Sequence, residues 1–268
     1  CGSDAKRETD TMPNWAGSSW YFLRFMDAHN KDEFASMDAM KYWNCVNWYN
    51  GGMEHTARHL LYARFWVQML YNFGLVPNKE MIDIRVSHGM ILGSNGEKMS
   101  KSKGNVINPD DIISEFGADT LRVYEMFIGD YQQDASWSTD SLKGCYRFLE
   151  RIERLGKKIN DKQGYTNETL ANRTIKKVTN DLVSLKYNTA VSALMIMLNE
   201  YEKFEEGITK DDYLLILTLL NPIAPHITEE LNESIGYAPL CESSWPEYDG
   251  AKTIDEEKSI AVQVNGRV

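Results

Sequence analysis

Two lysines lie three positions apart in a short polar run, and this spacing suits the binding of a polyphosphate. Lys98 and Lys101 stand in the string Lys-Met-Ser-Lys-Ser, which also supplies the hydroxyl groups of Ser100 and Ser102. Ammonium and hydroxyl groups can satisfy phosphate oxygens, and glycines on both sides leave the segment free to close over a ligand. A lysine-rich surface loop without a ligand has the same composition. On this string alone both interpretations stay open.

The residues around this run favour a loop with a defined structure. Met99 places an apolar side chain inside a charged loop, where it can act as an anchor. Downstream, Asn108-Pro109-Asp110-Asp111 followed by two isoleucines has the pattern of a turn that caps a helix. These signals favour phosphate binding over an irregular turn.

A second polar group follows a strand that the sequence predicts over residues 46–49. The glycines at 51 and 52 permit close backbone approach, and Met53-Glu54-His55 comes next. A helix starting there would aim its N-terminal amides at a ligand above the sheet edge. The order strand, glycines, helix therefore predicts a ligand site at this edge.

His55 and His59 are four residues apart and are expected on one face of that helix, with Tyr62 on the same stripe. Three interpretations of the pair are open. A metal site would need at least a third ligand, which the spacing of nearby residues does not supply. A core pair satisfied by internal hydrogen bonds is a structural alternative. A substrate pocket is favoured by the position of the pair upstream of Lys98.

Composition predicts an ordinary globular protein of one or two domains. The chain has 268 residues, 43% of them hydrophobic and 25% charged. Its most apolar stretch, residues 213–220, is too short to cross a bilayer. Four cysteines without paired spacing argue against a disulfide framework and against a self-contained zinc site, so we expect a reducing, cytoplasmic setting. The first residues include neither an initiator Met nor an apolar signal core, which favours a piece of a longer protein.

Charge is distributed unevenly, although the formal net charge is −10. Residues 143–177 contain ten Lys and Arg against four Asp and Glu, whereas residues 200–258 contain fifteen acids against four bases. In the basic segment, apolar residues recur at helical spacing, and a second stripe consists of Arg147, Arg151, Arg154 and Lys158. One face of this helix would pack while the other presents cations, which could meet nucleic-acid phosphates because phosphate binding uses Lys and Arg. A solvated helix face, neutralised by Glu150 and Glu153, is the alternative.

The order of elements predicts an α/β part followed by an all-α part. Residues 1–138 mix aromatic stretches, glycine turns and short apolar runs, as in a Rossmann-like parallel-sheet domain. Residues 139–250 predict an antiparallel helix bundle, with helices expected over residues 143–159, 173–186, 189–204 and 212–220. Residues 251–268 would begin a further, truncated segment, with a strand over 259–268.

Together these strings resemble the leucyl-tRNA synthetases, a family of class I aminoacyl-tRNA synthetases, over nearly the whole chain. The Lys-Met-Ser-Lys-Ser loop is a hallmark of class I, and the isoleucine, valine and methionine enzymes share it but differ at the other strings. The matching strings are Arg7-Glu8-Thr9-Asp10-Thr11-Met12, Ser18-Ser19-Trp20-Tyr21, Gly51-Gly52-Met53-Glu54-His55, His59-Leu60-Leu61-Tyr62-Ala63-Arg64-Phe65, the lysine loop, Gly117-Ala118-Asp119-Thr120, Leu220-Asn221-Pro222 and Pro225-His226. The resemblance implies the second half of the catalytic domain, followed by the helical anticodon-binding domain.

The resemblance also implies a role for each matching residue. Lys98 and Lys101 would be catalytic, because they steady the pyrophosphate leaving group while leucine attacks ATP. The implied substrates are leucine, ATP with Mg²⁺, and tRNA(Leu). The leucine pocket would be lined by Trp15, Ser18, Tyr21, His55 and His59, and ATP would bind at Gly52, Glu54, Met90, Ile91, Lys98, Ser100, Lys101 and Ser102.

Within the ATP site, the resemblance implies a separate task for each part of the nucleotide. Glu54 would accept hydrogen bonds from both ribose hydroxyls, and Gly52 would leave room for the sugar. The main chain at Met90 and Ile91 would meet the adenine edge. Without the resemblance, Glu54 could instead stabilise a helix N-terminus, and aromatic residues such as Trp15 and Tyr21 are more often structural. Trp137 and Ser138 are expected to be structural in any interpretation.

One departure from the family pattern limits what the chain is expected to do alone. The other catalytic signature of class I, His-x-Gly-His, begins at none of the five histidines. We therefore expect part of the active site, the first strands of the sheet and the editing domain to lie in a missing N-terminal half, and the isolated chain to be inactive. A short parallel sheet with an exposed edge and uncovered apolar surface should remain.

Zinc is expected only with the missing upstream segment, because Cys1-Gly2 resembles the second half of a Cys-x-x-Cys knuckle and cannot hold the metal alone. Two other functions remain as alternatives. A non-catalytic tRNA-binding module would use the arginine stripe and treat the α/β part as scaffold. A different class I synthetase would activate another amino acid.

Overall fold

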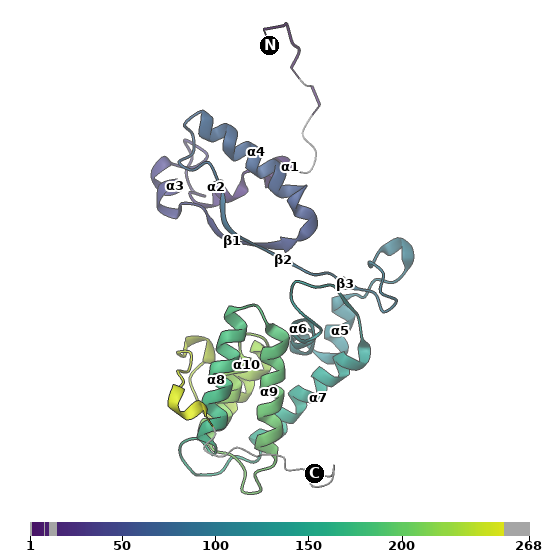
Figure 1. Cartoon of the computed structure of the whole chain (residues 1–268), viewed down its shortest axis with the longest axis vertical. Coiled ribbons are helices and arrows are strands. Elements are labelled where there is room, and N and C mark those ends of the chain that lie inside the picture. Colours follow the sequence, from purple (N-terminus) through teal and green to yellow (C-terminus); the bar gives the residue numbers. More distant parts are fainter. Residues whose placement is uncertain (1, 8, 11–14, 255–268) are drawn as a thin grey trace, which may run out of the picture. The chain divides into compact units, whose positions relative to one another are not determined.

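The computed structural model describes residues 2–7, 9–10 and 15–254. The chain forms two compact units, unit 1 over residues 1–89 and unit 2 over residues 90–268. Figure 1 labels the helices and strands of both. Each unit has its own cluster of buried apolar side chains, so each contains a core of its own.

Unit 1 contains a two-stranded parallel sheet. β1 (Val46–Gly52) pairs with β2 (Ile82–His88), and Val46 lies opposite Ile82 at one end and Gly52 opposite His88 at the other. Parallel neighbours need a crossover connection, which here includes α4 (His59–Asn72). The strand predicted over residues 46–49 is confirmed and extends through both glycines.

Three short helices precede the sheet: α1 (Trp15–Ser18), α2 (Tyr21–Phe25) and α3 (Met37–Trp43). The Ser36 side chain caps α3 by accepting a hydrogen bond from the backbone N–H of Ala39. Apolar residues from α2, α3, α4 and the loops form the unit 1 core, which consists of Leu23, Ala35, Met40, Ala63, Val67, Val76 and Met81.

Much apolar surface of unit 1 is exposed, in agreement with the expected incomplete sheet. Trp48 and Ile84, opposite each other in β1 and β2, are each 46% exposed. On α4, Leu61 and Phe65 are exposed although Ala63 and Val67 are buried. A helix that is apolar on both faces is typical of a larger core.

The start of the helix after the glycines differs from the prediction. Met53–Thr56 forms a 3₁₀ turn (η1), and α4 begins only at His59, after Arg58 adopts a non-helical conformation. His55 and His59 therefore belong to different helical segments, and their predicted placement on one helix face is wrong. The break follows from backbone geometry that a spacing of four residues does not reveal.

Unit 2 begins with a small parallel sheet of β3 (Ile91–Leu92) and β4 (Ala135–Ser136). The lysine loop, which contains the 3₁₀ turn η2 (Lys101–Lys103), and two helices connect these strands. The helices of unit 2 are α5 (Pro109–Phe116), α6 (Ala118–Phe127), α7 (Thr139–Gly156), α8 (Glu168–Val183), α9 (Tyr187–Glu202), α10 (Lys210–Leu220) and α11 (Pro225–Ser234). Two further 3₁₀ turns follow, η3 (Leu240–Glu242) and η4 (Gly250–Thr253).

The predicted bundle is confirmed, with shifts of a few residues at the helix ends. Helices α8 and α9 run side by side in Figure 1, α7 and α10 both contact α9, and α11 begins at Pro225. The apolar stripe of α7 packs as expected, with Cys145, Phe148, Leu149, Ile152 and Leu155 all buried. Amphipathic periodicity identifies such helices because a buried face repeats about every 3.6 residues.

The predicted helix cap at Asn108 is confirmed, and the structure adds further caps. The Asn108 side chain caps α5 by accepting from the N–H of Asp110, with Pro109 in the first turn. At α10, Thr209 and Asp212 form a reciprocal capping box. Ser138 caps α7, and Trp137 packs edge-on against Tyr124, so both residues are structural as predicted.

The α/β-plus-helical fold class is confirmed, and residues 90–138, including the lysine loop, belong to the same compact unit as the bundle. The domain boundary at 138/139 stays a prediction. The strand predicted over 259–268 lies outside the described residues. Among the helices that the structure describes, none combines the length and apolar character needed to traverse a bilayer.

Candidate active site

The lysine loop of unit 2 is held in a defined conformation. Met99 is partly buried and packs against the unit 2 core, which confirms its predicted anchoring role. The backbone N–H of Ser100 donates to Oδ1 of Asn105 over 2.9 Å. The hydroxyls of Ser100 and Ser102 lie 3.2 Å apart. An apolar anchor and a side-chain clamp therefore fix a segment whose charged groups face solvent.

The three lysines of this loop have different surroundings. Nζ of Lys103 lies 2.9 Å from Oε2 of Glu97 and forms an ion pair with it. Lys98 and Lys101 are exposed, and neither has an acidic partner among the described residues. The loop therefore presents two uncompensated cations at the two positions that the sequence singled out. Such a pair attracts anions with several negative oxygens.

The backbone next to β3 offers hydrogen-bonding groups at Ile91 rather than at Met90. The Met90 N–H donates to Oδ1 of Asp134 over 2.6 Å, and its carbonyl accepts from the N–H of Ala135. In a parallel ladder alternate residues face opposite edges. The N–H and C=O of Ile91 consequently face away from β4, so a planar ligand edge could meet them there.

In unit 1, His59 is a buried and fully hydrogen-bonded histidine. Its Nε2 lies 2.7 Å from the carbonyl oxygen of Ser18, and its Nδ1 lies 2.9 Å from Oη of Tyr49. Because a carbonyl can only accept, Nε2 carries a proton, and a neutral ring then accepts the Tyr49 hydroxyl at Nδ1. Burial raises the pKa of Tyr49, which keeps its hydroxyl proton available for this bond.

Aromatic rings surround His59. Trp15 stacks with His59 at a centroid distance of 6.4 Å and with Tyr62 at 6.5 Å. Tyr21 lies 6.0 Å from the His59 ring and is 41% exposed. Residues from α1, α2, β1 and α4 thus meet at one aromatic cluster, and its role as a leucine pocket stays a prediction.

His55 differs from His59 in the hydrogen bonding of one ring nitrogen. Its ring lies edge-on to Trp15 at 6.0 Å and to His59 at 6.4 Å. Its Nδ1 is buried and has no hydrogen-bond partner. A buried polar atom without a partner is costly, so His55 is suited to meet a group that arrives with a ligand. The alternative of a satisfied core pair therefore describes His59 but not His55.

Gly52 leaves space that the Glu54 side chain uses. A Cβ at position 52 would lie 2.3 Å from Oε2 of Glu54, closer than atoms can approach. The glycine was expected to leave room for a sugar, whereas here it allows the Glu54 carboxylate to fold back against the end of β1. Glu54 is itself exposed at the surface of unit 1.

No group of three or more His, Cys, Asp or Glu side chains is arranged to hold a metal ion within the described part of the chain. The pair His55 and His59 has no third ligand there, and both nitrogens of His59 already have partners. Cys1 lies outside the described residues.

The arginine stripe of α7 divides into paired and open cations. Arg151 donates to Glu202 through Nε at 3.0 Å and also contacts Oδ1 of Asn199. This guanidinium lowers the pKa of the Glu202 carboxyl. Arg147, Arg154 and Lys158 are exposed to solvent. Glu153 lies 3.9 Å from Lys157 instead of pairing with the stripe. Three of the four predicted cations therefore form no ion pair among the described residues, although Arg154 and Lys158 lie close enough to Glu202 to help lower the pKa of its carboxyl.

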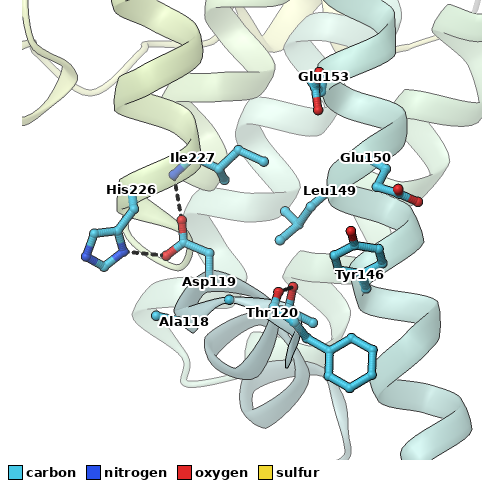
Figure 2. Close-up of a pocket in the computed structure, with 11 residues that line it drawn as sticks. Ala118, Asp119, Thr120, Tyr146, Leu149, Glu150, Glu153, His226 and Ile227 are labelled. Carbon is cyan, nitrogen blue, oxygen red and sulfur yellow. Dashed lines mark hydrogen bonds and ion pairs between the residues drawn. The ribbon is translucent and has the colours of Figure 1, made fainter. Parts of the chain in front are cut away.

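Two strings that match the synthetase pattern come together in a pocket of about 350 Å³ in unit 2. Figure 2 shows Asp119 at the start of α6 joined to His226 and Ile227 at the start of α11. An Asp119 oxygen accepts from Nδ1 of His226 over 2.8 Å and the other from the Ile227 N–H over 2.6 Å. These strings, more than a hundred positions apart, thus have a structural role in joining α6 to α11.

Sequence reasoning missed two residues in these sites. Asn105 stands directly after the lysine string, and its only signal was a polar side chain following Gly104. Asp119 belonged to a matching string but was assigned no contact. Hydrogen-bond partners so distant in sequence cannot be identified from spacing.

Comparison with protein families gives two matches. Residues 3–138 match the model of the tRNA synthetases class I (I, L, M and V). Residues 168–268 match the model of the anticodon-binding domain of tRNA ligase.

A Leucine--tRNA ligase of Alkaliphilus oremlandii (strain OhILAs) is 56% identical over 272 aligned residues, which cover 100% of this chain and 34% of that protein. The chain therefore spans about a third of the length of this curated relative. The resemblance to the leucyl-tRNA synthetases is confirmed.

Two kinds of solved structure are similar. The LeuRS of Agrobacterium radiobacter K84 (agnB2), in a ternary complex with tRNA and LeuAMS, has a TM-score of 0.82 at 30% identity, with 96% of this chain and 36% of that chain covered. A methionyl-tRNA synthetase of Mycobacterium tuberculosis, in complex with methionyl-adenylate, has a TM-score of 0.62 at 17% identity, with 84% and 50% covered. The second likeness concerns the fold alone.

Proposed function

The chain belongs to the tRNA synthetases of class I, and we propose that in the intact protein it supplies part of the site that activates leucine and the helices that bind tRNA(Leu). The observation that carries this proposal is the difference among the loop lysines. Lys103 is neutralised by Glu97, whereas Lys98 and Lys101 are exposed without an acidic partner among the described residues. Two such cations suit a leaving group that gains negative charge during the reaction.

The proposed reaction transfers the adenylyl group of ATP to leucine. A carboxylate oxygen of leucine forms a bond to the α-phosphorus, and the bond from this phosphorus to the oxygen that bridges to the β-phosphate breaks. The electron pair leaves with pyrophosphate, so charge builds on the β- and γ-oxygens. Lys98 and Lys101 stabilise that charge more strongly in the transition state than in the ground state. Mg²⁺ arrives with ATP as part of the substrate.

The nucleoside part of ATP would bind at the carboxyl ends of the strands. Glu54 offers a carboxylate to both ribose hydroxyls, and its side chain can swing away from Gly52 to do so. Ile91 offers an N–H and a C=O that face away from β4, which makes it a better partner for the adenine edge than Met90. Ser100 and Ser102 add hydroxyl donors at the phosphates.

The leucine side chain would enter the aromatic cluster of unit 1. Trp15, Tyr21 and His55 form its walls, with Ser18 nearby, and His59 orients the cluster through its bonds to Ser18 and Tyr49. An apolar cup distinguishes side chains by about 1–3 kcal/mol per methylene. This modest selectivity is consistent with an editing domain elsewhere in the protein.

We also propose that these 268 residues alone do not activate leucine. The sequence contains no His-x-Gly-His string, and unit 1 exposes apolar residues on both its sheet and α4. The N-terminal half of the enzyme would cover that surface and contribute the missing imidazoles. The free thiols of Cys45, Cys145 and Cys241 fit a reducing, cytoplasmic setting.

Leucine-dependent exchange of pyrophosphate into ATP tests the proposal. In the intact enzyme, the double change Lys98→Ala and Lys101→Ala should lower the exchange rate by at least about a thousandfold, because each preorganised contact to developing charge contributes about 10²–10³. Lys103→Ala is the matched control and should have little effect. Equal losses from all three lysines, or exchange with an amino acid other than leucine, would contradict the proposal.

The isolated chain offers a second test. It should exchange no pyrophosphate above background, and addition of the N-terminal half should restore activity. The double lysine change should abolish the restored activity. Exchange by the isolated chain near the rate of the intact enzyme would show that the missing half is not needed.

A non-catalytic tRNA-binding module is the second candidate, because three cations of α7 are exposed and form no ion pair among the described residues. Charge reversal at Arg147 and Arg154 should weaken tRNA(Leu) binding and lower the salt slope by about one unit per lost phosphate contact. Lys210→Glu, at the start of α10, is a control that reverses one charge away from the stripe and should have a much smaller effect. If leucine-dependent exchange is absent from the intact protein while tRNA binding persists, the module is the better description.

A further inference from the structure

Asn105 connects both sides of the lysine loop through its side-chain amide. Its Oδ1 accepts from the Ser100 N–H over 2.9 Å, and its Nδ2 donates to the carbonyl oxygen of Lys98 over 3.4 Å. The shorter bond is the stronger of the two. The amide thus holds the backbone on both sides of Met99, so it limits movement of the residue that anchors the loop.

Gly93 provides the space that this amide occupies. A Cβ at position 93 would lie 3.0 Å from Nδ2 of Asn105 and 2.9 Å from Oδ1 of Asn95. The Gly93 N–H also donates to the carbonyl of Glu97 over 2.8 Å. The turn before the lysine string and the asparagine after it are therefore packed against each other.

The direction of the two lysine side chains follows from this clamp. Met99 points into the unit 2 core, and the neighbouring Lys98 is exposed. Lys101 begins the 3₁₀ turn directly after Ser100. If Met99 left the core, Lys98 and Lys101 would both lose their present orientation, because the peptide units joining them to Met99 and Ser100 would rotate.

We propose that Asn105 is a positioning residue for activation of the amino acid: it holds Met99 in the core and thereby aims Lys98 and Lys101 at the leaving pyrophosphate. This inference rests on the function proposed above. Asn105 itself touches neither nucleotide nor leucine in this role. It reduces the number of loop conformations before the reaction. The two cations are then already in position when negative charge develops on the leaving group.

A structural role for Asn105 makes different predictions from a positioning role. If the amide only stabilises the turn, its loss lowers the thermal midpoint, and any loss of activity is the same whether or not the lysines are present. If it positions the lysines, its loss has no effect once they are gone. A double-mutant cycle distinguishes these cases.

The experiment measures leucine-dependent pyrophosphate exchange by the intact enzyme. Asn105→Ala should lower kcat/KM for ATP by roughly tenfold to a hundredfold, the cost expected of a misplaced catalytic group. KM for leucine should stay unchanged, because the leucine residues belong to unit 1. In a background of Lys98→Ala and Lys101→Ala, adding Asn105→Ala should produce no further loss in residual activity.

Asn95→Ala is the matched control. The Asn95 side chain also accepts from a loop backbone N–H, that of Glu97 over 3.2 Å, but it contacts neither Lys98 nor Ser100. This variant should keep kcat/KM for ATP within about twofold of the unchanged enzyme, since only a surface turn is affected.

The outcomes separate the inference from the proposed function. If the lysine changes abolish exchange while Asn105→Ala is fully active, the inference is wrong and the proposed function stands. An Asn105→Ala loss of equal size with and without the lysines also overturns the inference. If the lysine changes have no effect on exchange, the proposed function itself fails.

Discussion

Units 1 and 2 differ in how completely they bury their apolar residues. The unit 1 core contains seven buried apolar residues among those described, whereas the unit 2 core contains 29. Unit 1 exposes Trp48, Leu61 and Phe65, while unit 2 packs several helices around one continuous cluster. Net stability is a small difference between burial and conformational entropy, so we expect unit 2 to be the more stable unit.

The residues of the candidate active site are also divided between the two units. Unit 1 brings the candidate leucine pocket and Glu54, and it combines the smaller core with exposed apolar residues on its sheet and on α4. Unit 2 brings the lysine loop, anchored through Met99 to the large core. A loop that must hold two cations in place benefits from such a rigid base, because its anchor then moves little. The comparison indicates that the lysine loop rests on the larger of the two cores, whereas the aromatic cluster rests on the smaller one.

Removing a leucine from each core should give the largest difference. Leu194 is fully buried in unit 2 and Leu23 is 6% exposed in unit 1. Leu194→Ala should lower the free energy of unfolding by about 2–5 kcal/mol. Leu23→Ala should lower it by an amount near or below the lower end of that range, because the smaller core of unit 1 can collapse around the cavity. Urea unfolding followed by far-UV circular dichroism and by tryptophan fluorescence measures both. Equal losses of unfolding free energy from the two variants would contradict the expected difference in stability between the units.

Two histidine variants sharpen the comparison within unit 1. His59→Ala should destabilise the unit by about 1–3 kcal/mol or more, because it leaves the Ser18 carbonyl and the Tyr49 hydroxyl without partners. His55→Ala should leave the thermal midpoint nearly unchanged and raise KM for leucine in the intact enzyme, since its Nδ1 has no internal partner. Scanning calorimetry and exchange kinetics are the two measurements. The opposite pattern would exchange the roles of the two histidines.

The contact between α6 and α11 should contribute somewhat less to unit 2. Asp119→Ala removes the acceptor of both His226 and the Ile227 N–H, and we expect a loss of about 1–2 kcal/mol for these bonds. Asp161→Ala, at an exposed position in the loop after α7, is a control that should have almost no effect. Chemical denaturation would measure both changes. A neutral Asp119→Ala would mean that helix packing alone joins α6 to α11.

The smallest effect is expected at the ion pair between Arg151 and Glu202. Hydrogen bonding to Arg151 holds the pKa of Glu202 below its ordinary value of 4.5. A depressed carboxyl pKa stabilises the fold above the unfolded-state pKa, and that contribution is lost as pH falls through the folded pKa. Both side chains are about a third exposed, so the effect should stay below about 1 kcal/mol. Glu202→Gln should remove this part of the pH dependence below pH 4.5, as measured by urea unfolding at several pH values.

Local patterns in the sequence determined the elements and the identity of the chemical groups. The α7 stripe and the Asn108 cap were readable because periodicity and capping act over a few neighbouring residues. The lysine string and the glycines before Glu54 were readable because phosphate binding and close backbone approach each require particular residue types.

Contacts between distant residues were decided only by the tertiary structure. Both ring nitrogens of His59 have hydrogen-bond partners, Ser18 and Tyr49, whereas Nδ1 of His55 has none. Glu97 forms an ion pair with Lys103 but with neither of the other loop lysines. The tertiary structure also decided that Arg151 pairs across to α9. A side chain's partner depends on how separate elements pack, and the same residue types at the same spacing permit many such arrangements.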